Sequence, residues 1–488
     1  MSDFEQNQYD VLLYISDQHT ADAAGFIGDP IVRTPNLDSI AAGSFVLDNA
    51  YTSCPLCVPA RASLMTARMP SNISVFGNDS DFRSGEVTFA HSYALNGYDC
   101  NLIGRMHFVG MDFMHGFTRR IGTDMTPSYW GFPSEKREEL GDFRRALYQK
   151  HCLEVVGSGD SIVQAYDRDV VRDAIDFYQN DYDKPQLTVV GTYAPHFPYV
   201  ASEDKMEHYR EYFREHYTDE VKFFDLPPVD AKVQRTTKED IIELRAAYYA
   251  MIETMDEQIG AVYRAYREYL SRNNRKGIFI YMSDHGDQIG CMGIYGKQTF
   301  FEKSAKIPLL IKIDGVEGRR IEEAVSIMDV GPTLCDLNQT ESIPLADGRS
   351  FLNLIKGESE KGRYAVSEFY DSQIKQCQKG WMVFQDGWKY IRYDGYEAKD
   401  MLFDLRTSKD ETENLASAYP EKLDEMRSLL KSIPYIKDHE SEYLDCKKNH
   451  RFLAKVGNKQ HYLNEYIFIP PKESIYISDK CKRPHREW

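Results

Sequence analysis

Short apolar runs that alternate with helical patterns constrain the fold of this chain more than any other feature. The run "YDVLLYISD" (residues 9–17) ends in polar residues, and similar runs occupy residues 187–196, 276–287 and 307–313. Such runs are typical of buried strands. The longest helical pattern lies over residues 240–270, where apolar residues recur three and four positions apart. The alternation predicts an α/β fold with a large, mostly parallel central sheet flanked by helices.

The pattern changes near residue 360. Short strand-like segments separated by Gly and Asp turns occupy residues 364–411, and a helical pattern follows. We therefore predict an N-terminal domain over residues 1–360 and a small antiparallel sheet with a helix over residues 361–440. Residues 441–488 are predicted to form an arm that contacts a neighbouring subunit of a homo-oligomer.

Charge and composition exclude some partners and compartments. The formal net charge is −17, whereas nucleic-acid binding needs a basic surface, so we expect no nucleic-acid partner. A negatively charged substrate would need a local positive pocket. The N-terminal residues "MSDFEQNQYD" lack the basic and apolar regions of a signal peptide, and no long apolar run predicts a membrane span. The nine cysteines are scattered and odd in number, which favours a reducing compartment. We expect a cytoplasmic protein that does not contact a membrane.

Polar clusters follow two of the predicted strands, as "SDQHT" after the first and "SDHGD" after the third. In parallel sheets the chemistry gathers at the carboxyl ends of the strands. Asp17 and Asp284 can therefore converge on one cation, and Gln18 and His285 are adjacent candidates. Oxygen ligands favour a hard divalent ion such as calcium or magnesium. The alternative is that both aspartates are ordinary turn residues at strand ends.

The stretch "SCPLCVPARASLMTAR" (residues 53–68) contains a second candidate centre. Pro59 favours a helix start, which places Cys57 at a helix N-terminus, where free N–H groups favour an anion. Arg61 lies one turn further on and can reach the same end. A nucleophile here would meet a phosphate or sulfate group. Alternatively, Cys57 is a small buried apolar residue, or it forms a redox pair with Cys54.

The residues "CVPAR" followed by "SLMTA" match C-x-P-x-R, the signature of type I sulfatases, and the chain resembles that family over residues 9–435. Further matching stretches follow the family order: "YISDQHTADAAGFIGDPIVRTPNLDSIA", "NLIGRMHFVG", "APHFPY", "SDHGDQIG", "GKQTFFEKSAKIPLLIK" and "LFDLRTSKDETENLA". The stretches "GRMHFVGMDFMHGF" and "KQTFFEKSAKIPL" resemble the choline sulfatase branch. The resemblance implies an alkaline phosphatase-like fold and hydrolysis of a sulfate ester.

In this family the signature cysteine is oxidised to formylglycine by a formylglycine-generating enzyme or an anaerobic sulfatase-maturating enzyme. The resemblance implies the same fate for Cys57. The hydrated aldehyde is a geminal diol: one hydroxyl attacks sulfur and expels the alcohol, and the other then loses a proton. The carbon–oxygen bond breaks, sulfate leaves and the aldehyde is restored. A serine sulfate ester could not release sulfate in this way, because its carbon carries no second hydroxyl.

The resemblance also implies site residues. The implied cofactor is a divalent cation, with Ca²⁺ as the first candidate and Mg²⁺ or Mn²⁺ as alternatives, and its ligands would be Asp17, Gln18, Cys57, Asp284 and His285. The implied catalytic residues are Cys57, Arg61, Arg105, His107, His196 and Lys297.

Individual roles follow from the same resemblance. Arg61 would orient the diol, and His107 would take the proton of the second hydroxyl. His196 and Lys297 would bind the sulfate group and assist the leaving oxygen. Asn78 stands at the position of a polar substrate-pocket residue of the choline sulfatases. For either histidine alone, a structural role is the alternative.

Three positions depart from the common family pattern. Gln18 replaces a second aspartate, as it also does in choline sulfatases and phosphonate monoester hydrolases. Arg105 replaces a lysine, so a planar guanidinium stands in place of a compact ammonium group. We expect Arg105 to bind the diol or the sulfate. Ala67 replaces the glycine of L-x-T-G, which would weaken recognition by the maturation enzyme.

Three functions remain open from the sequence. The first is hydrolysis of a small sulfate monoester, such as a sulfated mono- or disaccharide or choline sulfate, for which Tyr129 and Trp130 would face the cationic headgroup. The second is a phosphonate monoester or phosphodiester hydrolase, a branch that lacks the histidine found here at position 107. The third is a thiol-redox protein that uses Cys54 and Cys57 and needs no metal.

Overall fold

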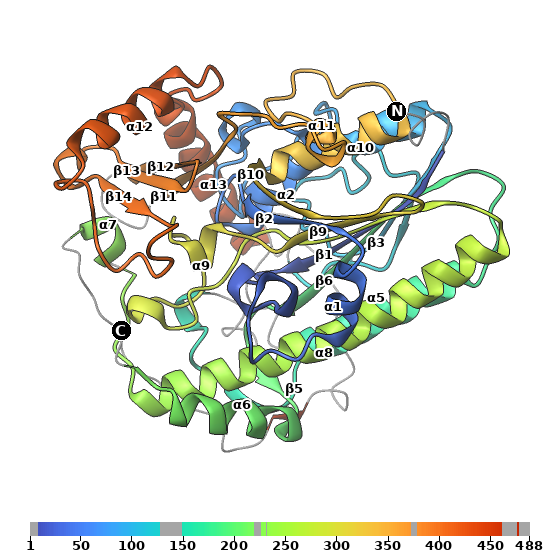
Figure 1. The fold of residues 1–488 in the computed structure, drawn as a ribbon, viewed down its shortest axis with the longest axis horizontal. Helices are drawn as coiled ribbons and strands as arrows, with labels where there is room; N and C mark the ends of the chain where they lie inside the picture. Colours follow the sequence, from blue (N-terminus) through green and yellow to red (C-terminus); the bar gives the residue numbers. More distant parts are fainter. Residues whose placement is uncertain are drawn as a thin grey trace.

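A central eight-stranded sheet organises the molecule (Figure 1). The structure is a computed structural model that describes residues 8–126, 149–218, 226–230, 232–371, 378–460 and 476–477. The strand order is β10-β2-β9-β8-β1-β6-β3-β4. The strands are β1 (Asp10–Asp17), β2 (Phe45–Tyr51), β3 (Asp99–Gly104), β4 (Arg119–Ile121), β6 (Gln186–Pro195), β8 (Gly277–Ser283), β9 (Leu309–Ile313) and β10 (Arg320–Ser326).

The sheet is mostly parallel, as the sequence predicts. The pairs β1–β6, β1–β8, β3–β6, β3–β4 and β2–β10 are parallel. Only β9 runs antiparallel to its neighbours β8 and β2. An apolar run shows that a strand is buried but does not encode its direction, so the sequence could not foresee this reversal.

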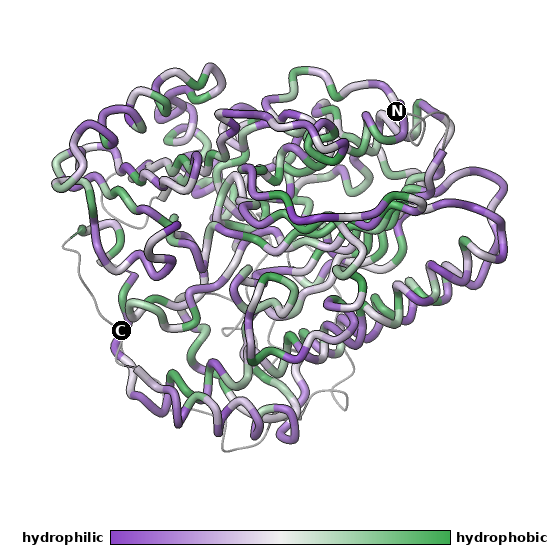
Figure 2. Tube along the Cα trace, viewed as in Figure 1, coloured by the Kyte–Doolittle hydropathy of each residue, from purple (hydrophilic) through white to green (hydrophobic). Residues whose placement is uncertain are grey.

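Helices cover both faces of the sheet, because successive side chains of each buried strand point to opposite sides. On β1, Leu12 and Tyr14 pack with the helices of one face, and Val11, Leu13 and Ile15 pack with those of the other. Figure 2 shows the apolar residues concentrated along the central strands. The first face carries α1 (Pro35–Ala41), α5 (Ile162–Tyr178) and α8 (Lys238–Arg272), and α6 (Glu203–Glu215) packs on α8. The second face carries α2 (Cys57–Thr66), α3 (Phe89–Leu95) and α10 (Val330–Asn338).

The described residues also form several short helices and strands. They are α7 (Pro227–Asp230), α9 (Glu302–Ala305), α11 (Leu352–Ile355) and a small sheet of β5 (Val156–Asp160), β7 (Tyr199–Ala201) and β15 (Tyr476–Ile477). Within the described ranges, no helix combines the length and the apolar character that crossing a membrane requires.

A second, antiparallel sheet follows in the C-terminal part, as predicted. It consists of β11 (Tyr364–Asp371), β12 (Gln378–Gln385), β13 (Trp388–Tyr393) and β14 (Met401–Asp404), followed by α12 (Pro420–Ser432). The chain then continues into α13 (Glu440–Gln460), where the sequence shows only a weak pattern. Tyr443 of α13 packs against Phe76 and Tyr370, which ties this helix to the loop after α2. The oligomer contact of residues 441–488 stays a prediction.

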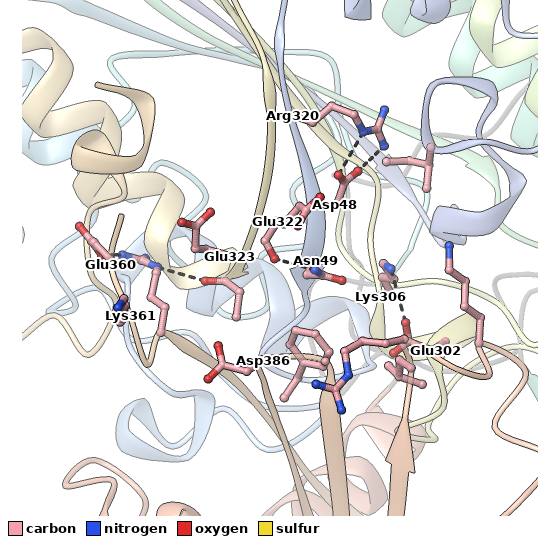
Figure 3. Close-up of a pocket in the computed structure, with 18 of the residues that line it drawn as sticks. Asp48, Asn49, Glu302, Lys306, Arg320, Glu322, Glu323, Glu360, Lys361 and Asp386 are labelled. Atoms are coloured by element: carbon pink, nitrogen blue, oxygen red, sulfur yellow. Dashed lines mark hydrogen bonds and ion pairs between the residues drawn. The ribbon is translucent and has the colours of Figure 1, made fainter. Parts of the chain in front are cut away.

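The two sheets meet along a seam of paired charges. Buried Lys389 of β13 lies 2.9 Å from Glu302 Oε1 and 2.8 Å from Glu411 Oε1. A cavity of about 650 Å³ opens along this seam between β2, β10 and the C-terminal sheet (Figure 3). Three pairs of opposite charge line it: Arg320–Asp48, Lys306–Glu302 and Arg363–Glu360. The residues that line it include none of the predicted site residues, so the predicted site lies elsewhere.

Glu368 on β11 makes the stability of this seam dependent on pH. Its backbone N–H donates to Ser53, and its Oε1 accepts the N–H of Ser71 at 2.8 Å. Burial raises the pKa of this carboxyl from 4.5 to about 7. Between these values the folded protein holds a proton that the unfolded chain releases. The contribution of Glu368 to stability is therefore largest below pH 4.5, and it is lost as the pH rises to about 7.

Glu368→Gln is expected to remove this pH dependence, because the amide keeps the acceptor and does not ionise. Relative to the wild type, the variant should gain about 3 kcal/mol of unfolding free energy between the acidic and alkaline ends of that range. Urea unfolding across the range measures the gain, and exposed Glu358→Gln is the matched control. A constant difference between Glu368→Gln and the wild type would refute the assignment.

Candidate active site

The predicted site residues meet at one edge of the central sheet. Strands β8, β1, β6 and β3 are consecutive, parallel neighbours, so their carboxyl ends coincide. Asp284 follows β8, Asp17 ends β1, His196 follows β6 and Arg105 follows β3. The pairing of Ser16 with Ser283 places the two aspartates at the same level.

Gly191 on β6 allows this edge to be compact. The backbone N–H of Arg105 donates to the carbonyl of Gly191 at 2.9 Å. A Cβ at position 191 would lie 1.7 Å from the carbonyl oxygen of Arg105. Only glycine therefore permits the turn after β3 to pass so close to β6.

Helix α2 brings the cysteine to the same edge, and it begins at Cys57, as the sequence predicts. All ten residues of the helix are buried. The Sγ of Cys57 lies 3.0 Å from Lys297 Nζ, 3.2 Å from His285 Nε2 and 3.6 Å from Asp17 Oδ1. The thiol is thus surrounded by groups from three other segments of the chain.

The two ends of α2 have local features of their own. Asn78 Oδ1 accepts the N–H of Val58 at 3.0 Å, so the predicted substrate residue also caps the first turn. Asn78 is an exposed residue. At the other end, Ala67 adopts a φ of +56°. A glycine fits this left-handed position without strain, which explains physically why the family pattern has one there.

The two aspartates divide their oxygens between two kinds of partner. Asp284 Oδ2 accepts from Arg61 Nε at 2.7 Å, and Asp17 Oδ2 accepts from Arg105 Nε at 2.8 Å and Arg61 Nη2 at 3.2 Å. The Oδ1 atoms instead face His285 Nε2, at 3.9 Å from Asp17 and 3.7 Å from Asp284. Burial raises the pKa of Asp17, but Arg105 and Arg61 outweigh it and hold that pKa well below its usual value.

His285 presents a lone pair to the same point. Its Nδ1 lies 3.0 Å from the carbonyl of Gly286, which can only accept, so Nδ1 carries the proton and Nε2 does not. Burial lowers the pKa of this imidazole and keeps it neutral. One ligand atom from each of Asp17, Cys57, Asp284 and His285 lies within 4.8 Å of the others. Two carboxylate oxygens and an imidazole nitrogen fit a divalent cation.

Gln18 and Lys297 complete this group. Gln18 has a φ of +70°, and Tyr248 fixes it by donating to its carbonyl at 2.7 Å. Its Oε1 accepts from Lys297 Nζ at 2.8 Å, and the same Nζ lies next to Cys57 Sγ. The Nζ of Lys297 also lies 4.0 Å from Asp17 Oδ1.

Arg105 is held by a partner that sequence reasoning missed. Its Nη1 donates to Asp124 Oδ1 at 2.7 Å, and Asp124 Oδ2 accepts the N–H of His107 at 3.0 Å. Arg105 Nη2 lies 2.6 Å from His107 Nδ1. A guanidinium only donates, so Nδ1 accepts and the proton of the neutral ring is on Nε2. Burial, reinforced by Arg105, lowers the pKa of His107 well below its usual value.

His196 has the opposite tautomer. Its Nδ1 lies 2.7 Å from the carbonyl of Phe197, so the proton is on Nδ1 and Nε2 is unprotonated. Burial and then Lys297 lower its pKa well below the usual value. The two histidines therefore offer different groups, an N–H from His107 and a lone pair from His196. Tyr129 and Trp130 lie outside the described residues.

Comparisons with known proteins identify the family of this chain. A family model described as Sulfatase matches residues 10–340, and a second, described as N-sulphoglucosamine sulphohydrolase, C-terminal, matches residues 290–435. The chain belongs to the sulfatase family.

This sulfatase is 33% identical over 418 residues to a choline-sulfatase of Rhizobium meliloti (strain 1021), covering 79% of this chain and 78% of the relative. It is 26% identical to an arylsulfatase of Clostridium perfringens (strain 13 / Type A), covering 90% and 96%. Its activity is hydrolysis of sulfate esters.

Solved structures share the fold. The phosphonate monoester hydrolase of Agrobacterium radiobacter superposes with a TM-score of 0.70 at 22% identity, covering 88% of this chain and 97% of that one. A 2-O GAG sulfatase superposes with a TM-score of 0.67 at 20% identity, covering 98% and 96%. The sulfatase therefore has the alkaline phosphatase-like fold that the sequence predicts.

Proposed function

We propose that this sulfatase cleaves a small sulfate monoester, such as choline sulfate or a sulfated mono- or disaccharide, through a formylglycine made from Cys57. The observation that carries the proposal is the position of Cys57, at the start of α2 and within 3.6 Å of Asp17, His285 and Lys297. The choline-sulfatase relative supports choline sulfate as the first substrate to test.

As a thiol, Cys57 is poorly suited to attack an ester. Burial, and then the nearby Asp17, raise its pKa from 9 to about 11. The thiolate is the nucleophilic form of cysteine, and it would be scarce at neutral pH. A geminal diol at this position needs no thiolate, which favours conversion of the residue over direct use of the sulfur.

We infer a divalent cation, with Ca²⁺ as the first candidate, held by Asp17, Gln18, Asp284 and His285 together with residue 57. When bound, the cation supplies positive charge against the charge that grows on the sulfuryl oxygens. The charge balance supports this inference, because four buried carboxylates more than offset three buried cationic groups: Asp17, Asp124, Asp284, Asp287, Arg61, Arg105 and Lys297. A divalent ion would leave the net positive site that a sulfate needs in a chain of net charge −17.

Side chains of the protein supply the other roles in the proposed reaction. Lys297 Nζ, 3.0 Å from Cys57 Sγ, offers N–H donors to the sulfuryl or leaving oxygen. Arg61 orients residue 57 from the next turn of α2. His107 Nε2 carries the proton in the arrangement described and can only donate. The base role expected from the resemblance therefore requires its contact with Arg105 to be released. His196 Nε2 offers a lone pair without such a step.

Peptide mass and a substrate panel test the proposal. The protein should be produced together with a maturation enzyme, and the tryptic peptide containing Cys57 should lose about 18 Da, the change from thiol to aldehyde. The matured protein should then turn over choline sulfate, sulfated sugars or an aryl sulfate. Unmodified Cys57 bonded to Cys54 would contradict the proposal, and it would favour the thiol-redox alternative.

The same panel separates the phosphonate alternative. A phosphonate monoester and a phosphodiester belong in it, because the fold is shared with a phosphonate monoester hydrolase. We expect sulfate esters to be the better substrates by kcat/KM. Preference for the phosphonate would overturn the choice of substrate while leaving the formylglycine in place.

A further inference from the structure

Asp287 is a buried carboxylate at the edge of the active site to which no role has been given so far. It lies two residues after His285 and has no exposed surface. Its Oδ1 accepts the backbone N–H groups of Ile289 at 2.8 Å and Gly296 at 2.9 Å. Its Oδ2 accepts from Gln18 Nε2 at 2.5 Å and from the Tyr199 hydroxyl at 2.6 Å. All four donors are neutral groups.

The contact with Asp287 decides which way the Gln18 amide points. The oxygen and nitrogen of a side-chain amide have nearly the same shape, so the neighbours alone select the orientation. A carboxylate only accepts, so Asp287 requires the NH₂ group on its side. The ammonium of Lys297 only donates, and it meets the amide oxygen at 2.8 Å on the other side. The two neighbours thus select the same orientation.

We propose that Asp287 is a positioning residue that orients the Gln18 amide, so that an oxygen rather than an N–H group faces the cation site. Asp287 also holds the N–H of Gly296, the residue before Lys297, and so fixes the segment that carries the lysine. This inference rests on the proposed function, because it assigns Gln18 to the cation. Asp287 itself does not touch substrate or cation and acts through Gln18 and Gly296.

Asp287→Asn tests the orientation with a minimal change of shape. The two backbone N–H groups at Oδ1 require an oxygen there, so the new NH₂ group must take the place of Oδ2. It would then face the NH₂ group of Gln18, and two donors cannot bond to each other. A flip of the Gln18 amide removes this conflict, because it brings the amide oxygen to the asparagine NH₂ group. The turned amide presents N–H groups to Lys297 and to the cation. Tyr199 can adapt, because its hydroxyl can accept as well as donate.

The Gln18→Glu/Asp287→Asn pair exchanges the two groups and should repair the site. The asparagine NH₂ donates to one carboxylate oxygen of residue 18, and the other oxygen faces the cation and Lys297. If Asp287 acts by orientation, the double variant recovers what the single variant loses. If Asp287 is merely structural, a second substitution beside it adds to the damage.

Cation binding is the readout, since it does not depend on turnover. Metal-stripped protein is titrated with Ca²⁺, and the rise in melting temperature gives an apparent Kd. Asp287→Asn should weaken Ca²⁺ binding by about 10- to 100-fold, the usual effect of losing a group that orients a ligand. The double variant should regain about tenfold of this.

Asp256→Asn on α8 is the matched control. Asp256 is also fully buried and also accepts from a side-chain amide, Asn36 Nδ2 at 2.8 Å, and from the backbone N–H of Leu37. It belongs to none of the contacts described for the active site. Its variant should lower the melting temperature without changing the apparent Kd for Ca²⁺.

Each result decides between the inference and its alternatives. Wild-type-like Ca²⁺ binding by Asp287→Asn, or a double variant no better than the single one, overturns the role of Asp287. Failure of both Asp287 variants to fold, when Asp256→Asn folds, assigns Asp287 to the fold and also overturns it. If the wild-type protein shows no Ca²⁺-dependent shift, the proposed cation site fails and this inference falls with it.

Discussion

Cys57→Ala is expected to abolish hydrolysis of sulfate esters while leaving the protein folded. Removing a nucleophile lowers the rate by on the order of 10⁴-fold or more, because the other site groups have nothing to activate. The fold should survive, since the substitution only removes one sulfur atom at the start of α2 and leaves the paired charges around it in place. Initial rates on a sulfate ester and a thermal melt measure the two effects.

Cys57→Ser separates the formylglycine mechanism from other uses of the same position. A serine can accept the sulfuryl group but has no second hydroxyl to expel it, so the reaction should stop after one turnover. Intact mass should then show a stable gain of about 80 Da, that of a sulfate ester. Continued turnover by this variant is incompatible with the mechanism.

Cys54→Ala is the control for the thiol-redox alternative. Cys54 is also buried and lies three residues before Cys57. In a sulfatase its loss should change turnover by only a few-fold, roughly the effect of a minor packing change. If both cysteines prove equally necessary and form a reversible disulfide, the redox alternative regains support.

The sequence predicted which strands and helix carry the site residues. It did not predict the hydrogen-bond partners of those residues. Strand periodicity predicted β1 and β8, and the topology of parallel strands then required Asp17 and Asp284 to meet. The proline at 59 predicted where α2 begins. These inferences succeed because they depend on local pattern and on rules that hold for every parallel sheet.

The partners of the site residues could not be predicted, because they depend on contacts between distant segments. Asp124 holds Arg105 across 19 positions, and nothing in its neighbourhood marks it as part of the site. Asp287 is visible in "SDHGD", yet its contact with Gln18 spans 269 positions. The tautomers of His107 and His196 are likewise set by a guanidinium and a carbonyl that only the fold brings close.

These buried partners change what the sequence predicts for Asp284→Ala. From sequence, this variant should lose activity and keep its fold. In the structure, Asp284 Oδ2 pairs with Arg61 Nε at 2.7 Å, and both side chains have no exposed surface. Breaking a buried pair leaves an uncompensated charge. We therefore expect Asp284→Ala to lose hydrolysis and, in addition, about 3–5 kcal/mol of unfolding free energy.

Asp169→Ala provides the comparison for this stability loss. Asp169 pairs with Arg172, the two side chains are 40% and 61% exposed, and exposed pairs contribute little, about 1 kcal/mol or less. Urea unfolding of the two alanine variants measures the difference. An Asp284→Ala midpoint equal to that of the wild type would show that Arg61 finds full compensation in Asp17 and the backbone carbonyls that it also contacts.

A double variant isolates the contribution of Asp284 to stability. In Arg61→Met/Asp284→Ala both members of the pair are uncharged, so the penalty for an unpaired buried charge disappears. Replacing a buried ion pair by apolar groups is often neutral or stabilising. The double variant should therefore unfold at higher urea than Asp284→Ala alone. It should remain inactive, because it lacks both Asp284 at the cation site and Arg61, which orients residue 57. Recovered stability would assign the pairing of Asp284 with Arg61 to the fold. If the double variant is less stable than Asp284→Ala, Arg61 supports the fold mainly through Asp17 and the carbonyls of Ser16 and Arg105. The stability loss of Asp284→Ala would then not come from an unpaired charge.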